Sequence, residues 1–185
     1  MATTEQGTEQ QRAEIDRHDR PLLSVVIPAY NEIGTIAEIL RLVLDEPTEK
    51  EVVVVDDGST DGTAQEVEKF AERGVRLVRH ERNQGKGAAL NTGFAAAEGR
   101  IILVQDADLE YDPENYAALL APLLADRADV VYGSRFLGGP HRVLYFWHFL
   151  ANRMLTFWSD LWSNTNLSDM ETGYKVFRRE VVGEL

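Results

Sequence analysis

Apolar residues between positions 22 and 133 form short runs, separated by longer segments in which apolar residues recur with helical spacing. The runs are Leu22–Ile27, Val52–Val55, Val75–Val78, Ile101–Val104 and Asp129–Gly133. Apolar runs with little polar alternation are typical of parallel strands that are buried on both faces. The alternation of runs and helical segments therefore predicts an α/β domain with an open, mostly parallel, doubly wound sheet.

The two ends of the chain differ from this central part, residues 21–140. Residues 1–20 are rich in Gln, Glu, Thr and Arg and bury too little apolar surface to offset ordering, so a disordered polar tail is expected. A partner-binding arm is the alternative. Residues 141–185 are expected to hold an acceptor-side helix, a return strand after Gly173 and the first turn of another helix, with the C-terminus truncated.

Large aromatic and aliphatic residues crowd into residues 141–162, which contain all three tryptophans. One interpretation is a helix that covers the sheet or forms a homodimer contact. The other is a surface for membrane lipid, because aromatic residues with basic neighbours suit the headgroup boundary.

Composition narrows the function class. The net charge of −12 argues against general nucleic-acid binding, and the absence of cysteine excludes disulfides and thiolate chemistry. No signal peptide and no uncharged apolar run of transmembrane length is visible, which favours a cytoplasmic protein.

Two acidic residues, Asp106 and Asp108, follow the apolar run Ile101–Val104. Ligands of open α/β sheets gather at the carboxyl ends of strands, and alternate residues share a face. Two hard oxygen ligands suit Mg²⁺ or Mn²⁺ shared with substrate phosphates, and Glu110 continues the series as a third candidate ligand. A helix cap or a solvated turn is the alternative.

A second acidic pair, Asp56 and Asp57, also follows a strand. A turn stabilised by aspartate is one interpretation, and a carboxylate that accepts a hydrogen bond from a nucleobase is the other. Thr63 and Glu66 have the spacing of a capping box for the next helix.

Two cations complete the set of candidates. Lys86 lies between two glycines at a predicted helix start, where backbone N–H groups and an ammonium can bind phosphate; a loop with a solvated lysine is the alternative. Arg135 follows the fifth strand and can pair with a phosphate through two hydrogen bonds, or form only a surface ion pair.

These motifs, in this order, resemble those of the family 2 glycosyltransferases of the GT-A fold, over about residues 22–182. The likeness is greatest to dolichyl- and polyprenyl-phosphate mannosyl- and glucosyltransferases. The matching segments are Val25–Glu32, Val54–Thr63, Asn83–Leu90, Gln105–Glu110, Gly133–Phe136 and Asp169–Lys175.

The resemblance implies a role for each matching residue. The wall around the nucleobase and ribose would consist of Pro28, Tyr30, Glu32 and Asp57. The nucleotide pocket would include Lys86. The metal that holds the donor diphosphate would be bound by Asp106 and Asp108, with Glu110 near it, where the family commonly has Gln. The acceptor phosphate would be bound by Ser134 and Arg135. The catalytic residues would be Asp108, Arg135 and Asp169.

The implied reaction transfers a hexose from a UDP-glucose or GDP-mannose type of donor to an acceptor, with inversion. Asp169 is the one candidate for a general base, and this scarcity favours a polyprenyl phosphate acceptor, whose oxygens are already ionised near pH 7. Such an acceptor would bring the protein to the cytoplasmic face of a membrane. A sugar-1-phosphate nucleotidyltransferase and a non-catalytic sugar-nucleotide-binding module are the alternatives. Family members continue past the position of Leu185 and usually carry a further basic residue there.

Overall fold

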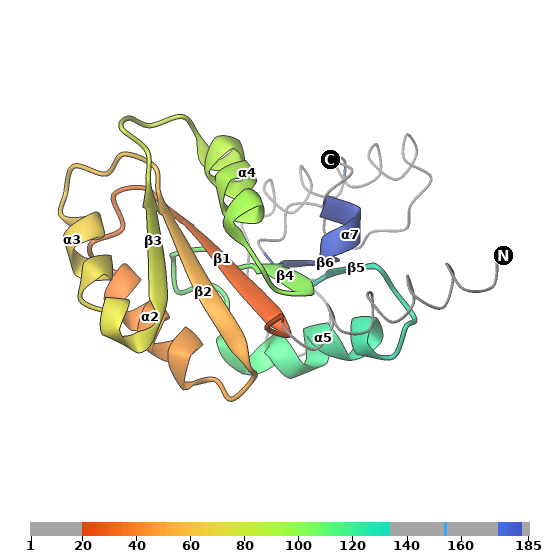
Figure 1. Cartoon of the computed structure of the whole chain (residues 1–185). Helices are drawn as coiled ribbons and strands as arrows, with labels where there is room; N and C mark the ends of the chain where they lie inside the picture. Colours follow the sequence, from red (N-terminus) through yellow and green to blue (C-terminus); the bar gives the residue numbers. More distant parts are fainter. Residues whose placement is uncertain (1–19, 134–153, 155–173, 183–185) are drawn as a thin grey trace, which may run out of the picture.

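The computed structural model describes residues 20–133, 154 and 174–182 (Figure 1). The elements of the first half are β1 (Leu23–Ala29), α2 (Ile36–Asp45), β2 (Lys50–Asp56), α3 (Thr63–Glu68), the 3₁₀ turn η1 (Ala71–Arg73), β3 (Val75–Arg79) and α4 (Lys86–Ala96). The second half has β4 (Ile101–Val104), the 3₁₀ turn η2 (Pro113–Asn115), α5 (Tyr116–Leu124), β5 (Val130–Tyr132), β6 (Lys175–Arg178) and α7 (Arg179–Val182). The predicted order of strands and helices is confirmed in these residues.

The six strands form one sheet in the order β3-β2-β1-β4-β6-β5. Strands β1 to β4 are mutually parallel where they pair, as the unbroken apolar runs predict. The chain winds outward from β1 through β2 to β3, and then crosses back through α4 to place β4 on the other side of β1. The winding direction thus reverses between β1 and β4, which is where open α/β sheets bind ligands.

The return strand expected after Gly173 is β6, but its position in the sheet was not predicted. It lies between β4 and β5 and runs antiparallel to both. The prediction of a mostly parallel sheet is confirmed, with this strand as the antiparallel exception.

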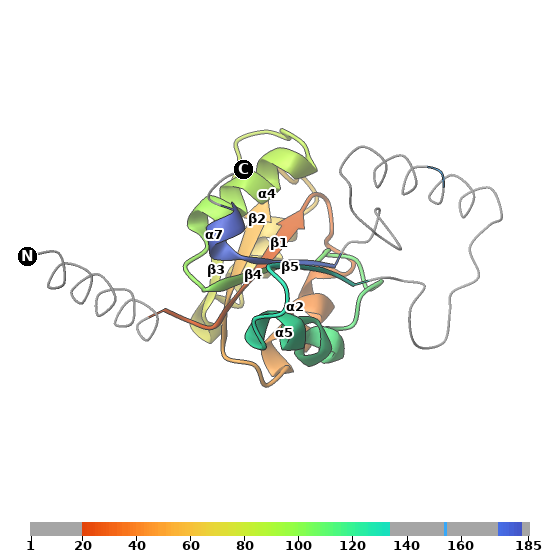
Figure 2. The ribbon, with the colours of Figure 1, turned by 90° about the vertical axis from the view of Figure 1, so that its right-hand side faces the viewer.

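Helices cover both faces of the sheet: Figure 2 shows α4 and α7 on one face and α2 and α5 on the other. The larger core lies on the α2 and α5 side, where Ile36, Ile39 and Leu40 of α2 are fully buried. On the opposite face α4 lies close to β1, because a side chain at Gly93 would overlap Val26. The double layer of helices explains why the strands are apolar on both faces.

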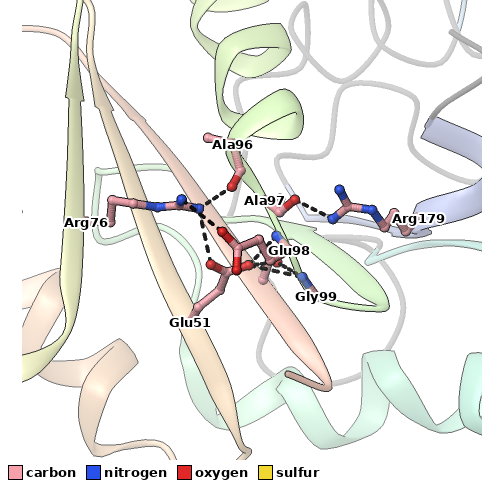
Figure 3. Close-up of polar contacts among 8 residues, drawn as sticks. Glu51, Arg76, Ala96, Ala97, Glu98, Gly99 and Arg179 are labelled. Atoms are coloured by element: carbon pink, nitrogen blue, oxygen red, sulfur yellow. Dashed lines mark hydrogen bonds and ion pairs between the residues drawn. The ribbon is translucent and has the colours of Figure 1, made fainter. Parts of the chain in front are cut away.

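At the amino ends of the strands, charged groups cluster around the C-terminal end of α4 (Figure 3). Glu51 accepts hydrogen bonds from the backbone N–H groups of Glu98 and Gly99 and from the Ser24 hydroxyl. The Arg76 guanidinium lies 3.2 Å from a Glu51 oxygen and 3.3 Å from a Glu98 oxygen. We call the seven residues labelled in Figure 3 the far-end cluster: Glu51, Arg76, Ala96, Ala97, Glu98, Gly99 and Arg179.

Three predicted residues lie outside the described part of the chain, namely Ser134, Arg135 and Asp169, as does nearly all of the aromatic segment 141–162. Among the residues that the structure describes, no helix combines the length and apolar character needed to cross a bilayer.

Candidate functional site

A cavity of about 330 Å³ opens at the carboxyl ends of β1, β2 and β4, where the sheet reverses its winding. All residues that the sequence predicts for nucleotide-sugar binding line it: Pro28, Tyr30, Glu32, Asp57, Lys86, Asp106 and Asp108. The lining also includes Ala29, Asn83, Ala89 and Ala107, which were not predicted. Asn83 begins the glycine-containing segment that precedes α4, so its sequence position was a usable signal.

The loops after β1 and β2 are joined by reciprocal hydrogen bonds. The Asn31 N–H donates to the Ser59 hydroxyl over 2.9 Å, and the Thr60 N–H donates to the Asn31 side-chain oxygen over 2.9 Å. Asn31 has a φ of 57°, a left-handed conformation that asparagine adopts more readily than most residues. These bonds hold the segment that carries Tyr30 and Glu32 against the β2 loop.

Thr63 and Asp61 extend this connection, and the predicted capping box is wrong. Helix α3 begins at Thr63 itself and has no side-chain cap. The Thr63 hydroxyl instead donates to Asp61 over 2.6 Å and accepts a hydrogen bond from the Glu32 N–H over 2.8 Å. The second Asp61 oxygen accepts from the Ile33 N–H over 3.1 Å. The Thr63 hydroxyl, which a local cap would use, is thus engaged by Asp61 and by the loop after β1.

The two aspartates at the end of β2, Asp56 and Asp57, have different contacts. Asp56 is fully buried, accepts a hydrogen bond from the Ser59 N–H over 3.3 Å and pairs with Arg79. It therefore takes the turn-forming role. Asp57 lines the cavity, so the turn interpretation describes Asp56, and the contact of Asp57 with a nucleobase stays a prediction.

Asp57 also fixes the loop that leads to α4. One of its oxygens lies 2.6 Å from His80 Nδ1 and 2.9 Å from the Gln84 N–H, while the other accepts from the Gly85 N–H over 2.8 Å. Burial acts to raise the pKa of Asp57, but these hydrogen bonds and the electrostatic attraction of His80 outweigh it and hold the pKa below its ordinary value. The Asp57 carboxylate in the cavity wall is therefore ionised at neutral pH.

Sequence reasoning missed His80. It is the first residue after β3, and its other ring nitrogen lies 2.9 Å from the Thr92 hydroxyl of α4. A histidine directly after a strand was a weak signal, because only the folded chain brings it to Asp57, 23 residues away.

Gly58 allows the loops to approach each other closely. It has a φ of 74°, and a Cβ there would lie 2.6–2.8 Å from backbone atoms of Arg82 and Asn83. A larger residue would push the β3–α4 loop, which lines the cavity, away from the β2 loop.

Lys86 is the first residue of α4, and its ammonium lies 2.6 Å from an Asp106 oxygen. The Lys86 side chain is 58% exposed and that of Asp106 is 16% exposed. The predicted cation and the predicted metal-binding acid are thus neighbours across the cavity. Because the first N–H groups of a helix lack intrahelical partners, this corner also favours an anion.

Asp106 and Asp108 both line the cavity, as does Ala107 between them, which is 3% exposed. An Asp108 oxygen accepts a hydrogen bond from the Glu110 N–H over 3.1 Å. The Glu110 side chain is exposed and is not among the residues of the cavity lining. In the described part of the chain, no group of three or more acidic or histidine side chains is arranged for a metal. A role for Glu110 stays a prediction.

Solved structures with the same architecture were compared with the chain. A mannosyltransferase from Pyrobaculum calidifontis, in complex with GDP-mannose and Mn²⁺, aligns with a TM-score of 0.64 and 28% identity, over 89% of this chain and 46% of that one. Glucosyl-3-phosphoglycerate synthase from Mycobacterium tuberculosis, with Mn²⁺, UDP and phosphoglyceric acid, aligns with a TM-score of 0.68 and 25% identity, over 91% of this chain and 59% of that one. The GT-A architecture is confirmed.

Curated relatives include a Methanocaldococcus jannaschii protein, MJ1222, which is 31% identical over 95% of this chain and 74% of its own length. Dodecaprenyl-phosphate galacturonate synthase of Rhizobium johnstonii is 34% identical over 61% of this chain and 36% of its own length. Dolichol-phosphate mannosyltransferase of Pyrococcus furiosus is 32% identical over 63% of this chain and 34% of its own length. The chain thus spans about a third of these two enzymes. The family model described as Glycosyl transferase family 2 matches residues 24–185, and the chain belongs to glycosyltransferase family 2.

Proposed function

We propose that the protein transfers a hexose from a nucleoside diphosphate sugar to a polyprenyl or dolichyl phosphate, with inversion and with Mg²⁺ or Mn²⁺ as cofactor. The observation that carries this proposal is the single cavity at which Asp57, Lys86 and the Asp106–Asp108 pair meet. Membership of family 2 supports it. So do the structural neighbours, which were solved with GDP-mannose or UDP and with Mn²⁺.

The chemistry of Asp106 and Asp108 fits a divalent cation. Carboxylate oxygens are the ligands that Mg²⁺ and Mn²⁺ prefer, and two such ligands leave coordination positions for diphosphate oxygens and water. When bound, the ion would neutralise the charge that develops on the departing nucleoside diphosphate. Its fit to the site rests on the shared cavity lining of the two aspartates.

The protein's own residues bind and orient the donor. Pro28 and Ala29 offer an apolar wall, and Tyr30, a residue that is 47% exposed, stands where a base or ribose can pack on its ring. The ionised Asp57 can accept a hydrogen bond from a ring N–H of the base. Lys86 can exchange its contact with Asp106 for one with the diphosphate, because its ammonium is exposed at the cavity.

The acceptor side of the proposal concerns residues outside the described ranges. Ser134 and Arg135 would bind the acceptor phosphate, and a guanidinium can do so through two parallel hydrogen bonds. A phosphate acceptor is already ionised near pH 7, whereas a hydroxyl acceptor would need Asp169 as a base. The names of three relatives, a dodecaprenyl-, a dolichol- and an undecaprenyl-phosphate enzyme, support the phosphate acceptor.

A lipid acceptor implies a membrane surface. We place the protein peripherally on the cytoplasmic face, with the aromatic segment 141–162 at the headgroup boundary. Sedimentation with anionic liposomes tests this, with Trp147→Ala/Trp158→Ala as the comparison. Equal sedimentation of both proteins, or none, would argue for the core or homodimer interpretation of the segment.

Donor binding is the first test of the proposed function. Isothermal titration of the whole chain with UDP- and GDP-sugars, with and without Mn²⁺, should identify one base whose affinity rises with the metal. The control variant is Asp45→Asn. It changes an exposed acid that pairs with Arg73 and does not line the cavity. Absence of binding by any sugar nucleotide, with or without metal, would contradict the proposal.

Product analysis separates the enzyme classes. With the preferred donor and polyprenyl phosphate in detergent, release of a nucleoside diphosphate and a glycolipid is expected. Release of pyrophosphate from a nucleoside triphosphate and a sugar phosphate would instead indicate a nucleotidyltransferase. Binding of the donor without any turnover would indicate a non-catalytic module.

A further inference from the structure

Gln105 is a fully buried polar residue directly after β4, and nothing in the proposed chemistry uses it directly. It directly precedes Asp106, and its exposed fraction is 0%. A buried amide is costly unless its hydrogen bonds are satisfied, so its partners identify its role.

The two ends of the Asp106–Tyr111 loop meet at this one amide. Gln105 Nε2 donates to the backbone carbonyl of Asp106 over 3.1 Å and to that of Tyr111 over 3.3 Å. The same loop carries Asp108, which faces the cavity. Both hydrogens of the amide nitrogen are therefore used to close the loop that presents the two aspartates.

Tyr116 of α5 fixes the orientation of the amide. Its hydroxyl donates to Gln105 Oε1 over 2.9 Å. Burial raises the pKa of Tyr116 well above its ordinary value, so the hydroxyl remains a donor. A flipped amide would point its oxygen at two carbonyl oxygens, which cannot donate, so the arrangement has one satisfied orientation.

Contacts between aromatic rings also hold the Asp106–Tyr111 loop. The Tyr111 ring lies 4.7 Å from the Tyr174 ring of the chain segment at β6, and Tyr174 in turn lies 6.1 Å from the Tyr116 ring in an edge-on contact. The loop is thus held by a buried ring at one end and by the amide at both ends.

We infer that Gln105 is a positioning residue for the donor–metal site: it holds the Asp106–Tyr111 loop closed so that Asp106 and Asp108 face the cavity together. The inference rests on the proposed function. Partners that orient metal ligands typically change metal affinity 10–100-fold when they are removed. Gln105→Leu should therefore raise the Mn²⁺ concentration for half-maximal donor binding about tenfold or more, while metal-free nucleotide binding changes little.

The main comparison is with Leu103→Ala. Leu103 is also fully buried, lies on β4 two residues before Gln105 and packs in the core that contains Tyr111 and Tyr116, but its apolar side chain makes no hydrogen bond with the loop. This control should lower the melting temperature and leave the Mn²⁺ requirement unchanged at temperatures well below unfolding. An equal Mn²⁺ requirement for Gln105→Leu and Leu103→Ala would overturn the inference.

Tyr116→Phe is the second variant, and it keeps the test decisive if Gln105→Leu does not fold. It removes only the hydroxyl that orients the amide, so its effect on the Mn²⁺ requirement should be smaller and in the same direction. Effects that add independently in the double variant would contradict a shared network.

Amide hydrogen exchange of residues 107–111, measured without ligand, separates the inference from the proposed function. Faster exchange of this loop in Gln105→Leu than in Leu103→Ala supports the closing role, and equal exchange contradicts it. If the unaltered chain shows no Mn²⁺-linked donor binding, the proposed function fails, and the exchange result still decides whether Gln105 holds the loop.

Discussion

The two ends of the sheet use the same kinds of charged residue in different ways. In the far-end cluster, Glu51 accepts hydrogen bonds from Ser24 and two backbone N–H groups and also pairs with Arg76. At the cavity, Asp108 accepts one hydrogen bond within the described residues, from the Glu110 N–H, and Asp106 pairs with a lysine that is 58% exposed. Because a carboxylate can accept about four hydrogen bonds, the cavity acids retain capacity for a ligand and Glu51 does not.

Helix α4 connects these two ends. It begins at Lys86 beside the cavity and ends at Ala96, and it has no basic residue in its last turn. Two cations from other elements take this place: Arg76 donates to the carbonyl of Ala96, and Arg179 donates to that of Ala97 (Figure 3). The last carbonyls of α4 thus have hydrogen-bonded cations as partners, which fixes this end of the helix. The other end carries Lys86, whose ammonium is available to a ligand.

The largest expected effect on donor binding is that of Asp108→Asn. The change keeps the shape and removes a charged ligand, so Mn²⁺-linked donor affinity should fall about 100-fold or more, or roughly 2.7 kcal/mol. Titration calorimetry with and without Mn²⁺ measures this. Unchanged Mn²⁺-linked binding would reassign the cavity acids to a structural role like that of Glu51.

Lys86→Met should have the next largest effect, about a tenfold loss of donor affinity, because one cation near the diphosphate is removed. The loss should also be smaller at high salt, since the ammonium is exposed. Lys69→Met is the matched control: Lys69 is 66% exposed and pairs with Glu66 on the surface. Equal binding by both variants would contradict a role for Lys86.

Asp57→Asn should lower stability by about 1–3 kcal/mol at pH 7, because the groups that bond to this buried carboxylate lose a charged acceptor. The folded-state pKa of Asp57 is lowered, so its stabilisation is complete above the unfolded pKa of about 3.9 and is lost as pH falls through the folded pKa. Urea unfolding from pH 7 to pH 2 should show the two proteins converging in acid. A pH-independent difference would contradict this assignment. Donor affinity should fall several-fold, since the Gln84–Gly85 loop loosens.

Glu51→Gln should have the smallest effect on donor binding. It should lower stability by about 1–3 kcal/mol because the charged acceptor of Arg76 and of the Gly99 N–H is lost. Donor affinity and its Mn²⁺ dependence should remain as in the unaltered chain. A change in donor affinity would show that the far-end cluster acts on the cavity through α4, and the contrast between the two ends would no longer hold.

The sequence by itself determined the order of elements and the edge of the sheet at which the predicted site residues lie. Runs such as Val52–Val55 can only be buried on both faces, and parallel strands with crossover helices bring their carboxyl ends to one edge. Asp57, Lys86 and Asp106 therefore meet at that edge wherever the exact loops run. The local pattern was sufficient to predict this, because periodicity specifies which faces of an element are buried and strand direction specifies which edge of the sheet holds the carboxyl ends.

Only the tertiary structure decided which side chains touch. The capping box at Thr63 was wrong because its hydroxyl bonds with Asp61 and with the Glu32 N–H of another loop. No local pattern indicated that His80 would contact Asp57 or that Tyr116 would contact Gln105. The insertion of β6 beside β4 was likewise not indicated. Hydrogen bonds between segments far apart in sequence depend on donor–acceptor distances that are correct to within a few tenths of an ångström, and hydrophobic periodicity carries no information at that scale.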